Sequence, residues 1–289
     1  MKQVLVTGAT GFIGQHVVPA LLEQGYEVIA VAREQKKLQS MSWKNKVRFI
    51  ACDLHDLELD TVKILGIPEM LIHLAWPGLP NYKDFFHFEE NLPADYRFIR
   101  KMVTSGVKHV LVTGTCFEYG MQSGMLSEDT PTAPANPYGL AKDTLRKFLQ
   151  SLQKTKPFTL QWLRLFYIYG PGQNPNSLFA QLDSAIDRGD TVFNMSGGEQ
   201  LRDYLPVEEV AHRIALLAEH PECDGIFNCC SGKPISVRRL VKEHLVRRGV
   251  HIKLNLGYYP YPDYEPMAFW GDCRRLEKIL LKGNDYELG

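Results

Sequence analysis

Two side chains four residues apart provide the first candidate chemistry. Tyr138 and Lys142 lie in the segment 136–142 (NPYGLAK), at the start of a predicted helix, so both project from the same helix face. A tyrosine, with an ordinary pKa of about 10, exchanges a proton near neutral pH only beside a cation, which a lysine one turn away supplies. The spacing predicts an acid–base pair. It is also common by chance, so its weight depends on the motifs that accompany it.

A glycine-rich loop near the start of the chain predicts a phosphate-binding site. Gly8, Gly11 and Gly14 follow the apolar run 4–7 and directly precede a helical pattern. Glycine permits a tight turn and close approach of backbone to pyrophosphate, and the following helix directs free N–H groups and its positive dipole end at the phosphates. The alternative is a turn with a purely structural role. The strand–turn–helix context favours a dinucleotide site.

The next two strands suggest which dinucleotide is bound. The run 27–32 ends in an alanine followed by Arg33, so the acid that binds an adenosine 2′-hydroxyl is missing and no carboxylate is available there. Arg33, with Lys36 and Lys37 nearby, can pair with a 2′-phosphate, which favours NADP(H) over NAD. The alternative is a solvated basic loop. Asp53 follows the third strand and is placed to meet the adenine, or else caps a helix.

The elements that must position these residues form an α/β pattern. Near-continuous apolar runs alternate with helical periodicity, which predicts a doubly wound parallel sheet of the Rossmann type. The predicted strands are 4–7, 27–32, 47–52, 70–75, 109–113 and 159–166, and the predicted helices are 14–24, 96–105 and 138–152. Thr115 follows the run 109–113, at the carboxyl edge where such sheets bind ligands. Its hydroxyl then faces the ligand, or else bonds to backbone.

The strict alternation ends after residue 166, where proline and glycine become frequent. We therefore predict a dinucleotide-binding domain over 1–166, rejoined by about 203–230 with a further core strand at 225–230. The smaller C-terminal substrate lobe would comprise 167–202 and 231–289.

Composition excludes several classes of function. The 289 residues carry 33 Lys+Arg and 33 Asp+Glu, so no broad positive field draws the chain to nucleic acid. The six cysteines and nine histidines form no ligand motif, so no metal is expected. Neither a signal peptide nor an apolar span long enough for a membrane helix is evident. The expected compartment is the cytoplasm.

With these motifs the sequence resembles the extended short-chain dehydrogenase/reductase family, the NAD-dependent epimerase/dehydratase group that acts on nucleotide sugars. The resemblance covers most of the chain and is specific for the family, though not for one reaction. It rests on the glycine loop, the stretch 113–120 and the Tyr138–Lys142 pair. Further matching stretches are 71–75, Asn91, 164–172 and 202–210.

The resemblance implies roles for individual residues. Tyr138 would donate or accept the proton, Lys142 would bind the nicotinamide ribose and lower the tyrosine pKa, and Thr115 would polarise the substrate carbonyl. Arg202 would hold the substrate diphosphate, the alternative being an ion pair with Asp203 or a nearby glutamate. The predicted cofactor contacts are Gly8, Thr10, Gly11, Phe12, Ile13, Gly14, Arg33, Asp53, Leu54, Leu74, Ala75 and Asn91, with Tyr138 and Lys142.

Departures from the family pattern bear on the reaction. Many members have asparagine where this chain has Tyr167, and the dehydratases place an Asp-Glu pair where it has Cys116 and Phe117, so elimination of water is poorly provided for. Cys116 could be an acid or base, or a buried inert thiol. Glu118 could be an extra acid or could order its loop. The predicted substrate contacts are Cys116, Glu118, Tyr167 and Arg202.

These observations favour an NADPH-dependent 4-ketoreductase for a nucleotide-linked 4-keto-6-deoxyhexose. A second interpretation is a 4-epimerase with tightly held NAD. A third, from another class, is a non-catalytic scaffold that senses a dinucleotide. Family members are often homodimers formed through two helices of each subunit, for which the helices at 96–105 and 138–152 would serve here.

Overall fold

Seven parallel strands form the central sheet of the computed structural model, which describes residues 2–56 and 60–284. Their order is β12-β7-β5-β4-β1-β2-β3, which confirms the predicted doubly wound α/β fold. The order reverses between β1 and β4, so a crevice lies at their carboxyl ends. The strands are β1 (Gln3–Thr7), β2 (Glu27–Ala32), β3 (Arg48–Ala51), β4 (Met70–His73), β5 (His109–Thr115), β7 (Thr159–Leu165) and β12 (Gly225–Cys229).

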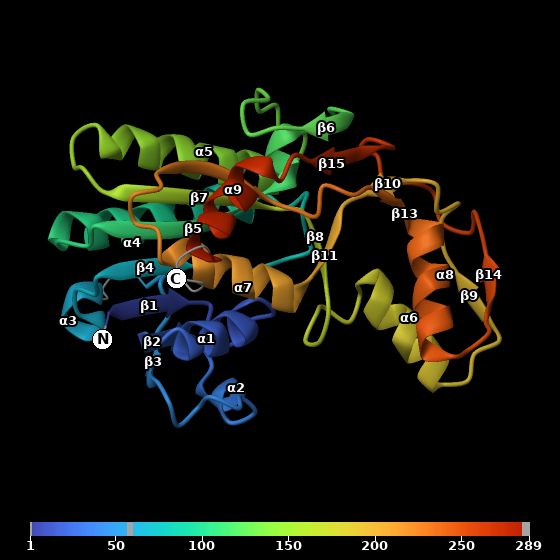
Figure 1. Ribbon diagram of the computed structural model, residues 1–289, viewed down its shortest axis with the longest axis horizontal. Helices are drawn as coiled ribbons and strands as arrows, with labels where there is room; N and C mark the ends of the chain where they lie inside the picture. Colours follow the sequence, from blue (N-terminus) through green and yellow to red (C-terminus); the bar gives the residue numbers. More distant parts are fainter. Residues whose placement is uncertain (1, 57–59, 285–289) are drawn as a thin grey trace.

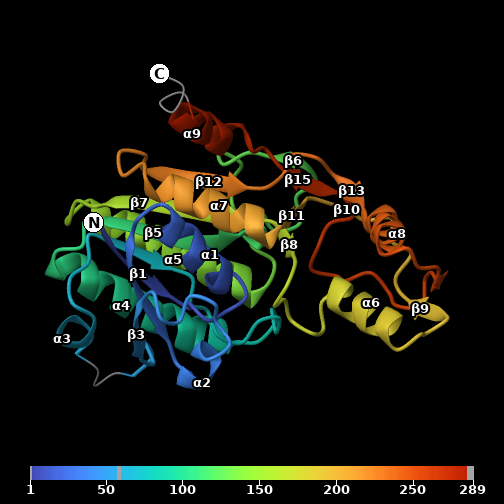
Figure 2. The ribbon, with the colours of Figure 1, turned by 60° about the horizontal axis from the view of Figure 1, so that its bottom comes forward.

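Helices cover both faces of this sheet because its strands are apolar on both sides. On one face α1 (Gly14–Glu23) packs beside α7 (Val207–Ala218), as Figure 2 shows, and α9 (Arg274–Asn284) contacts α7. On the other face α4 (Leu92–Ser105) and α5 (Pro137–Gln153) share a core with α3 (Thr61–Leu65). The short helix α2 (Gln35–Leu38) follows β2.

A second hydrophobic core lies beyond the carboxyl end of the sheet (Figure 1). It is built from α6 (Leu178–Asp187), α8 (Val237–Arg248), β9 (Val192–Asn194) and β14 (Lys253–Asn255). Three further strand pairs lie outside the central sheet: β8 (Tyr167–Tyr169) with β11 (Tyr204–Pro206), β10 (Leu201–Arg202) with β13 (Ile235–Ser236), and β6 (Gly124–Leu126) with β15 (Phe269–Gly271). The domain boundaries given above stay predictions.

Three element ends differ from the sequence prediction by two residues or more: the start of α4 and the ends of β5 and β4, the last of which ends at His73 and not at residue 75. Helix α4 begins at Leu92, four residues before the predicted start, because Pro93 is accommodated in the first turn of a helix. A π-helical turn, η1 (His87–Asn91), leads into it. Strand β5 runs on to Thr115, which then caps the 3-10 turn η2 (Cys116–Tyr119). Among the described residues, no helix has the length and apolar character required to cross a membrane.

Candidate active site

A cleft of about 610 Å³ opens at the carboxyl ends of β1 to β4. Asn91, Tyr138 and Lys142, which were also predicted to contact the cofactor, lie outside its lining and are buried. The other predicted cofactor contacts line the cleft: Gly8, Thr10, Gly11, Phe12, Ile13, Gly14, Arg33, Asp53, Leu54, Leu74 and Ala75.

The conformation of the glycine loop allows close backbone packing and the binding of an anion. Gly8 has a φ of 68°, and a Cβ on it would lie 2.8 Å from the backbone nitrogen of Ala75. A Cβ on Gly14 would overlap the carbonyl oxygen of Gly8. The N-cap residue of α1, Ile13, makes no side-chain capping bond, so the first amides of the helix have no side-chain acceptor. These features fit the pyrophosphate of a dinucleotide.

The adenosine end of the cleft differs in one respect from the sequence argument. Arg33 is exposed there and forms no salt bridge within the described residues. Glu34 also lines the cleft, 3.0 Å from Lys37, so a carboxylate overlooked in the sequence is available at the end of β2. Asp53 accepts a hydrogen bond from the backbone of His55 at 3.0 Å. Its side chain therefore stabilises a turn and does not cap a helix.

The three predicted catalytic residues come together behind the cleft. Asn136 caps α5 by accepting from Gly139 N at 2.8 Å, which places Tyr138 and Lys142 in its first turns. Lys142 Nζ donates to the carbonyl oxygen of Thr113 at 2.9 Å. Burial raises the pKa of Tyr138, and a hydrogen bond with the Thr115 side chain acts in the opposite direction. The geometry suits proton transfer at Tyr138, and the roles of the three residues stay predictions.

An aromatic side chain that sequence reasoning missed covers Lys142. The Lys142 ammonium lies 4.0 Å from the centre of the Trp76 ring, and the residue is 1% exposed. Burial lowers the pKa of Lys142 to about 8, and the charges of Asp95 and Glu118 oppose that shift. Trp76 Nε1 donates to His87 Nδ1 at 3.0 Å. The segment that carries Trp76 directly follows the matching stretch 71–75, which was the available signal.

Glu118 has interior partners for both of its oxygens, and its contact with substrate stays a prediction. It is fully buried, and its Oε1 accepts from Thr115 N and Trp162 Nε1, both at 2.9 Å. Its Oε2 accepts from Arg164 Nε at 2.7 Å, with Arg146 Nε 3.7 Å away. Both oxygens are thus engaged inside the protein. The structure supports the alternative, that Glu118 orders its loop.

Two further predicted substrate contacts, Arg202 and Tyr167, lie together in a second group, in which Arg202 is buried and Tyr167 is partly buried. Arg202 is 1% exposed and donates to Glu265 Oε2 at 2.8 Å and to the Tyr167 hydroxyl at 3.1 Å. Its ion-pair partner is therefore Glu265 and not Asp203, which accepts from the backbone of Ser231 and Gly232. Contact of Arg202 with a diphosphate stays a prediction.

The Cys116 thiol interacts with the Thr115 side chain and with the charge of Arg202. Cys116 is 5% exposed, and burial raises the pKa of its thiol. A nearby positive charge, Arg202, lowers that pKa, but less than burial raises it. The thiol therefore stays protonated near neutral pH. This favours the alternative of an inert buried cysteine.

Two loops meet over Tyr138 and separate it from solvent. The Tyr82 ring lies 5.6 Å from that of Tyr138 and 6.0 Å from that of Tyr264, centroid to centroid. Lys83 and Asp263 join the same loops by an exposed ion pair of 2.8 Å. The loop after β4 and the segment before β15 therefore both bound the space in front of the catalytic tyrosine.

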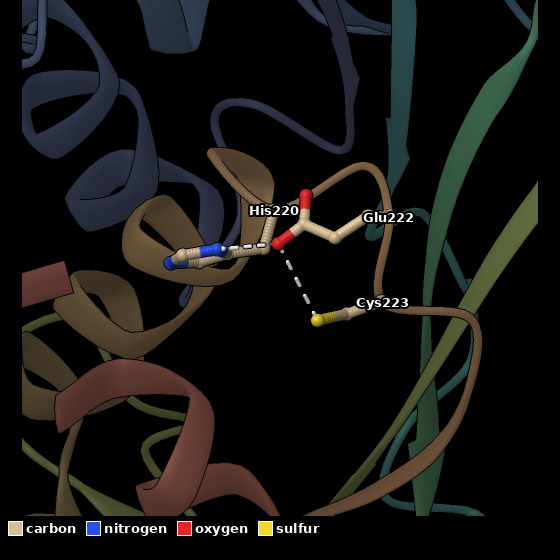
Figure 3. Close-up of side chains that lie close together, drawn as sticks. All are labelled: His220, Glu222 and Cys223. Carbon is tan, nitrogen blue, oxygen red and sulfur yellow. Dashed lines mark hydrogen bonds and ion pairs between the residues drawn. The ribbon is translucent and has the colours of Figure 1, made fainter. Parts of the chain in front are cut away.

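One group of side chains in the described part of the chain has the composition of a metal site. Figure 3 shows His220, Glu222 and Cys223 in the turn between α7 and β12, with their ligand atoms within 4.8 Å of one another. A hydrogen bond of 2.9 Å from His220 to Glu222 and a contact of 3.7 Å from Cys223 to Glu222 account for this proximity. The turn lies at the amino end of β12, whereas the catalytic group lies at the carboxyl end of β5. These three side chains are therefore not part of the candidate active site.

Comparison with known proteins identifies similar chains. A family model described as the NAD dependent epimerase/dehydratase family matches residues 4–230. A dTDP-6-deoxy-L-talose 4-dehydrogenase (NAD(+)) of Aggregatibacter actinomycetemcomitans is 34% identical over 93% of this chain and 98% of its own length. A UDP-glucose 4-epimerase of Halalkalibacterium halodurans is 29% identical, over 83% and 78%. The structure of MoeE5 in complex with UDP-glucuronic acid and NAD is 30% identical, with a TM-score of 0.83 over 96% of this chain and 92% of that one.

The buried ion pairs of Glu118 yield a stability prediction. Glu118→Gln keeps the side-chain shape but leaves Arg164 buried without its counter-ion, so unfolding free energy should fall by about 3–5 kcal/mol. Urea denaturation measures the change. Glu243→Gln is the control, because its pair with Arg239 is exposed and should contribute less than about 1 kcal/mol. Equal losses in the two variants would contradict a structural role for Glu118.

Proposed function

The chain belongs to the NAD-dependent epimerase/dehydratase family, and on that basis we propose that it reduces the 4-keto group of a nucleotide-linked 4-keto-6-deoxyhexose with NADPH. One observation carries the proposal: the chain aligns with 98% of a relative named as a 4-dehydrogenase of a dTDP-linked 6-deoxyhexose. That named reaction is oxidation at C4. Run in reverse, it is the reduction proposed here.

The arrangement behind the cleft supports this chemistry. When bound, the nicotinamide cofactor supplies the hydride that C4 receives. The Tyr138 hydroxyl would give its proton to the carbonyl oxygen, and the Thr115 hydroxyl would hold that oxygen by a hydrogen bond. The Lys142 ammonium would stabilise the tyrosinate that forms. Both Tyr138 and Thr115 are buried, so little water competes for the proton.

The choice of NADPH rests on Arg33. Its guanidinium lines the cleft at the end of β2, where a 2′-phosphate would lie, and no acid of the described residues is ion-paired with it. Glu34 lines the same region and would favour a 2′-hydroxyl instead, although it is paired with Lys37. The dehydrogenase relative is named for NAD(+), so NADH is the competing cofactor in the assay.

The 4-epimerase interpretation is the second candidate. The similarity to a UDP-glucose 4-epimerase favours it, but that relative is less similar to this chain and less completely covered than the dehydrogenase. The scaffold interpretation loses support because the relatives are named as enzymes.

The homodimer stays part of the proposal, and Leu140 and Phe148 on α5 are exposed as a helical interface requires.

The first test follows nicotinamide absorbance when the purified chain meets NADPH, or NADH, and dTDP-4-keto-6-deoxyglucose, with the sugar product followed by mass. Stoichiometric oxidation of the cofactor with a gain of two hydrogens in the sugar is expected. Tightly bound NAD in the purified protein, with an isomerised nucleotide sugar and no net oxidation, would instead establish the epimerase.

The role of Tyr138 is tested by Tyr138→Phe. Loss of the hydroxyl removes the proton donor, so kcat should fall at least about 100-fold. Cofactor affinity, measured by fluorescence titration, should stay within about threefold because the phenyl ring keeps its packing. Substantial residual turnover would refute the assignment.

The cofactor preference is tested by Arg33→Ala. Losing a charge-assisted hydrogen bond should raise KM for NADPH about tenfold or more, with little change in KM for NADH. Lys36→Ala is the control, since Lys36 is exposed but does not line the cleft. If wild-type protein prefers NADH, or if Arg33→Ala raises both KM values equally, the NADPH preference is wrong.

A further inference from the structure

The turn between α7 and β12 brings three different metal-ligating side chains together. His220, Glu222 and Cys223 each offer one ligand atom, and these atoms lie within 4.8 Å of one another (Figure 3). The central atom is Glu222 Oε1, which lies 2.9 Å from His220 Nδ1 and 3.7 Å from Cys223 Sγ. Tetrahedral zinc bonds of about 2.0–2.3 Å place neighbouring ligand atoms about 3.3–3.8 Å apart. Small side-chain rotations would therefore convert this arrangement into a zinc site.

The backbone of this turn is held by a buried side chain of the central sheet. Gln161 on β7 is fully buried. Its Nε2 donates to the carbonyl oxygens of Leu217, His220 and Cys223, at 3.1, 2.8 and 3.2 Å. Asp224, the next residue of the turn, accepts from a backbone amide of β7 at 2.7 Å. The ligand-bearing backbone is thus already ordered, which lowers the entropic cost of binding an ion.

The donor set selects the class of metal ion. Thiolate and imidazole are typical ligands of zinc, whereas magnesium and calcium take oxygen ligands. Hydrogen bonds from its own backbone and from His220 lower the pKa of Glu222, so its carboxylate is ionised. When zinc binds, the Cys223 thiol would lose its proton to solvent, and the proton on His220 Nδ1 would move to Nε2. The two negative ligands would then balance the charge of the ion.

We propose that His220, Glu222 and Cys223 bind one zinc ion, which stabilises the junction of α7 and β12. Glu222 is exposed, so a water molecule can be the fourth ligand. The turn lies at the amino end of β12, whereas the cofactor cleft opens at carboxyl ends of the sheet, so the ion would not reach the reacting atoms. The compact spacing in 220–223 (HPEC) matches no zinc-ligand motif, which is why the sequence predicted no metal.

Zinc titration of the full chain, after treatment with a chelator, tests the site. Calorimetry should show one zinc ion bound per chain, and zinc should raise the thermal unfolding temperature because it binds the folded state. His220→Ala and Cys223→Ser each remove a ligand and should weaken zinc affinity at least about 100-fold, since groups behind the ligands already contribute about 10–100-fold. Magnesium should leave the unfolding temperature unchanged.

The matched control is His244→Ala. It removes another imidazole that is paired with a carboxylate, that of Asp183 at 2.7 Å, but lies outside the proposed site. Zinc affinity should be the same in this variant as in the wild type. If His244→Ala weakens zinc binding as much as His220→Ala does, the ion binds elsewhere and the inference is wrong.

Cobalt(II) in place of zinc gives a readout that is specific for the thiolate. A cobalt–thiolate charge-transfer absorption is expected in the wild type and in His244→Ala, and it should be absent in Cys223→Ser. Because the thiol must lose its proton, zinc affinity should rise between about pH 6 and about pH 8. Absence of zinc binding by the wild type, or equal affinity in Cys223→Ser, would overturn the inference. Neither readout depends on ketoreductase activity.

Discussion

The buried carboxylate of Glu118 joins the two elements that carry the catalytic group, β5 and α5, to strand β7. Its oxygens accept from Thr115 N at the end of β5 and from Trp162 and Arg164 on β7, and they face Arg146 on α5. A charge sealed in the interior is tolerated only while such partners remain in place. Glu118 therefore fixes the position of Thr115 relative to α5, and hence to Tyr138 and Lys142.

Burial has two opposing consequences for that group. It excludes water from Tyr138 and Thr115, which favours directed proton transfer. It also raises the pKa of Tyr138 and lowers that of Lys142 to about 8, and both shifts work against an ionised tyrosine–lysine pair. The hydrogen bond from Thr115 and the negative charge of Asp95 act against these shifts. The site is therefore a balance between exclusion of solvent and local charge.

The cofactor cleft and the space in front of Tyr138 are built differently. Close backbone packing that only glycine permits shapes the loop at Gly8 and Gly14, so this part of the cleft depends little on the choice of other side chains. Side chains from two separate segments bound the space before Tyr138: Tyr82 after β4 and Tyr264 before β15. This difference is consistent with a family that shares one cofactor site and acts on many sugars.

The sequence by itself determined the strand–glycine–helix unit, the parallel α/β sheet and the one-turn spacing of Tyr138 and Lys142, because these depend on local periodicity and on steric properties of glycine. Only the tertiary structure decided that Glu118 points inward, that Arg202 pairs with Glu265, that Glu34 reaches the cleft and that Trp76 covers Lys142. Each of these depends on the direction of a side chain, and three of them on a partner distant in the chain. Neither the direction of a side chain nor the identity of a distant partner can be read from spacing along the sequence.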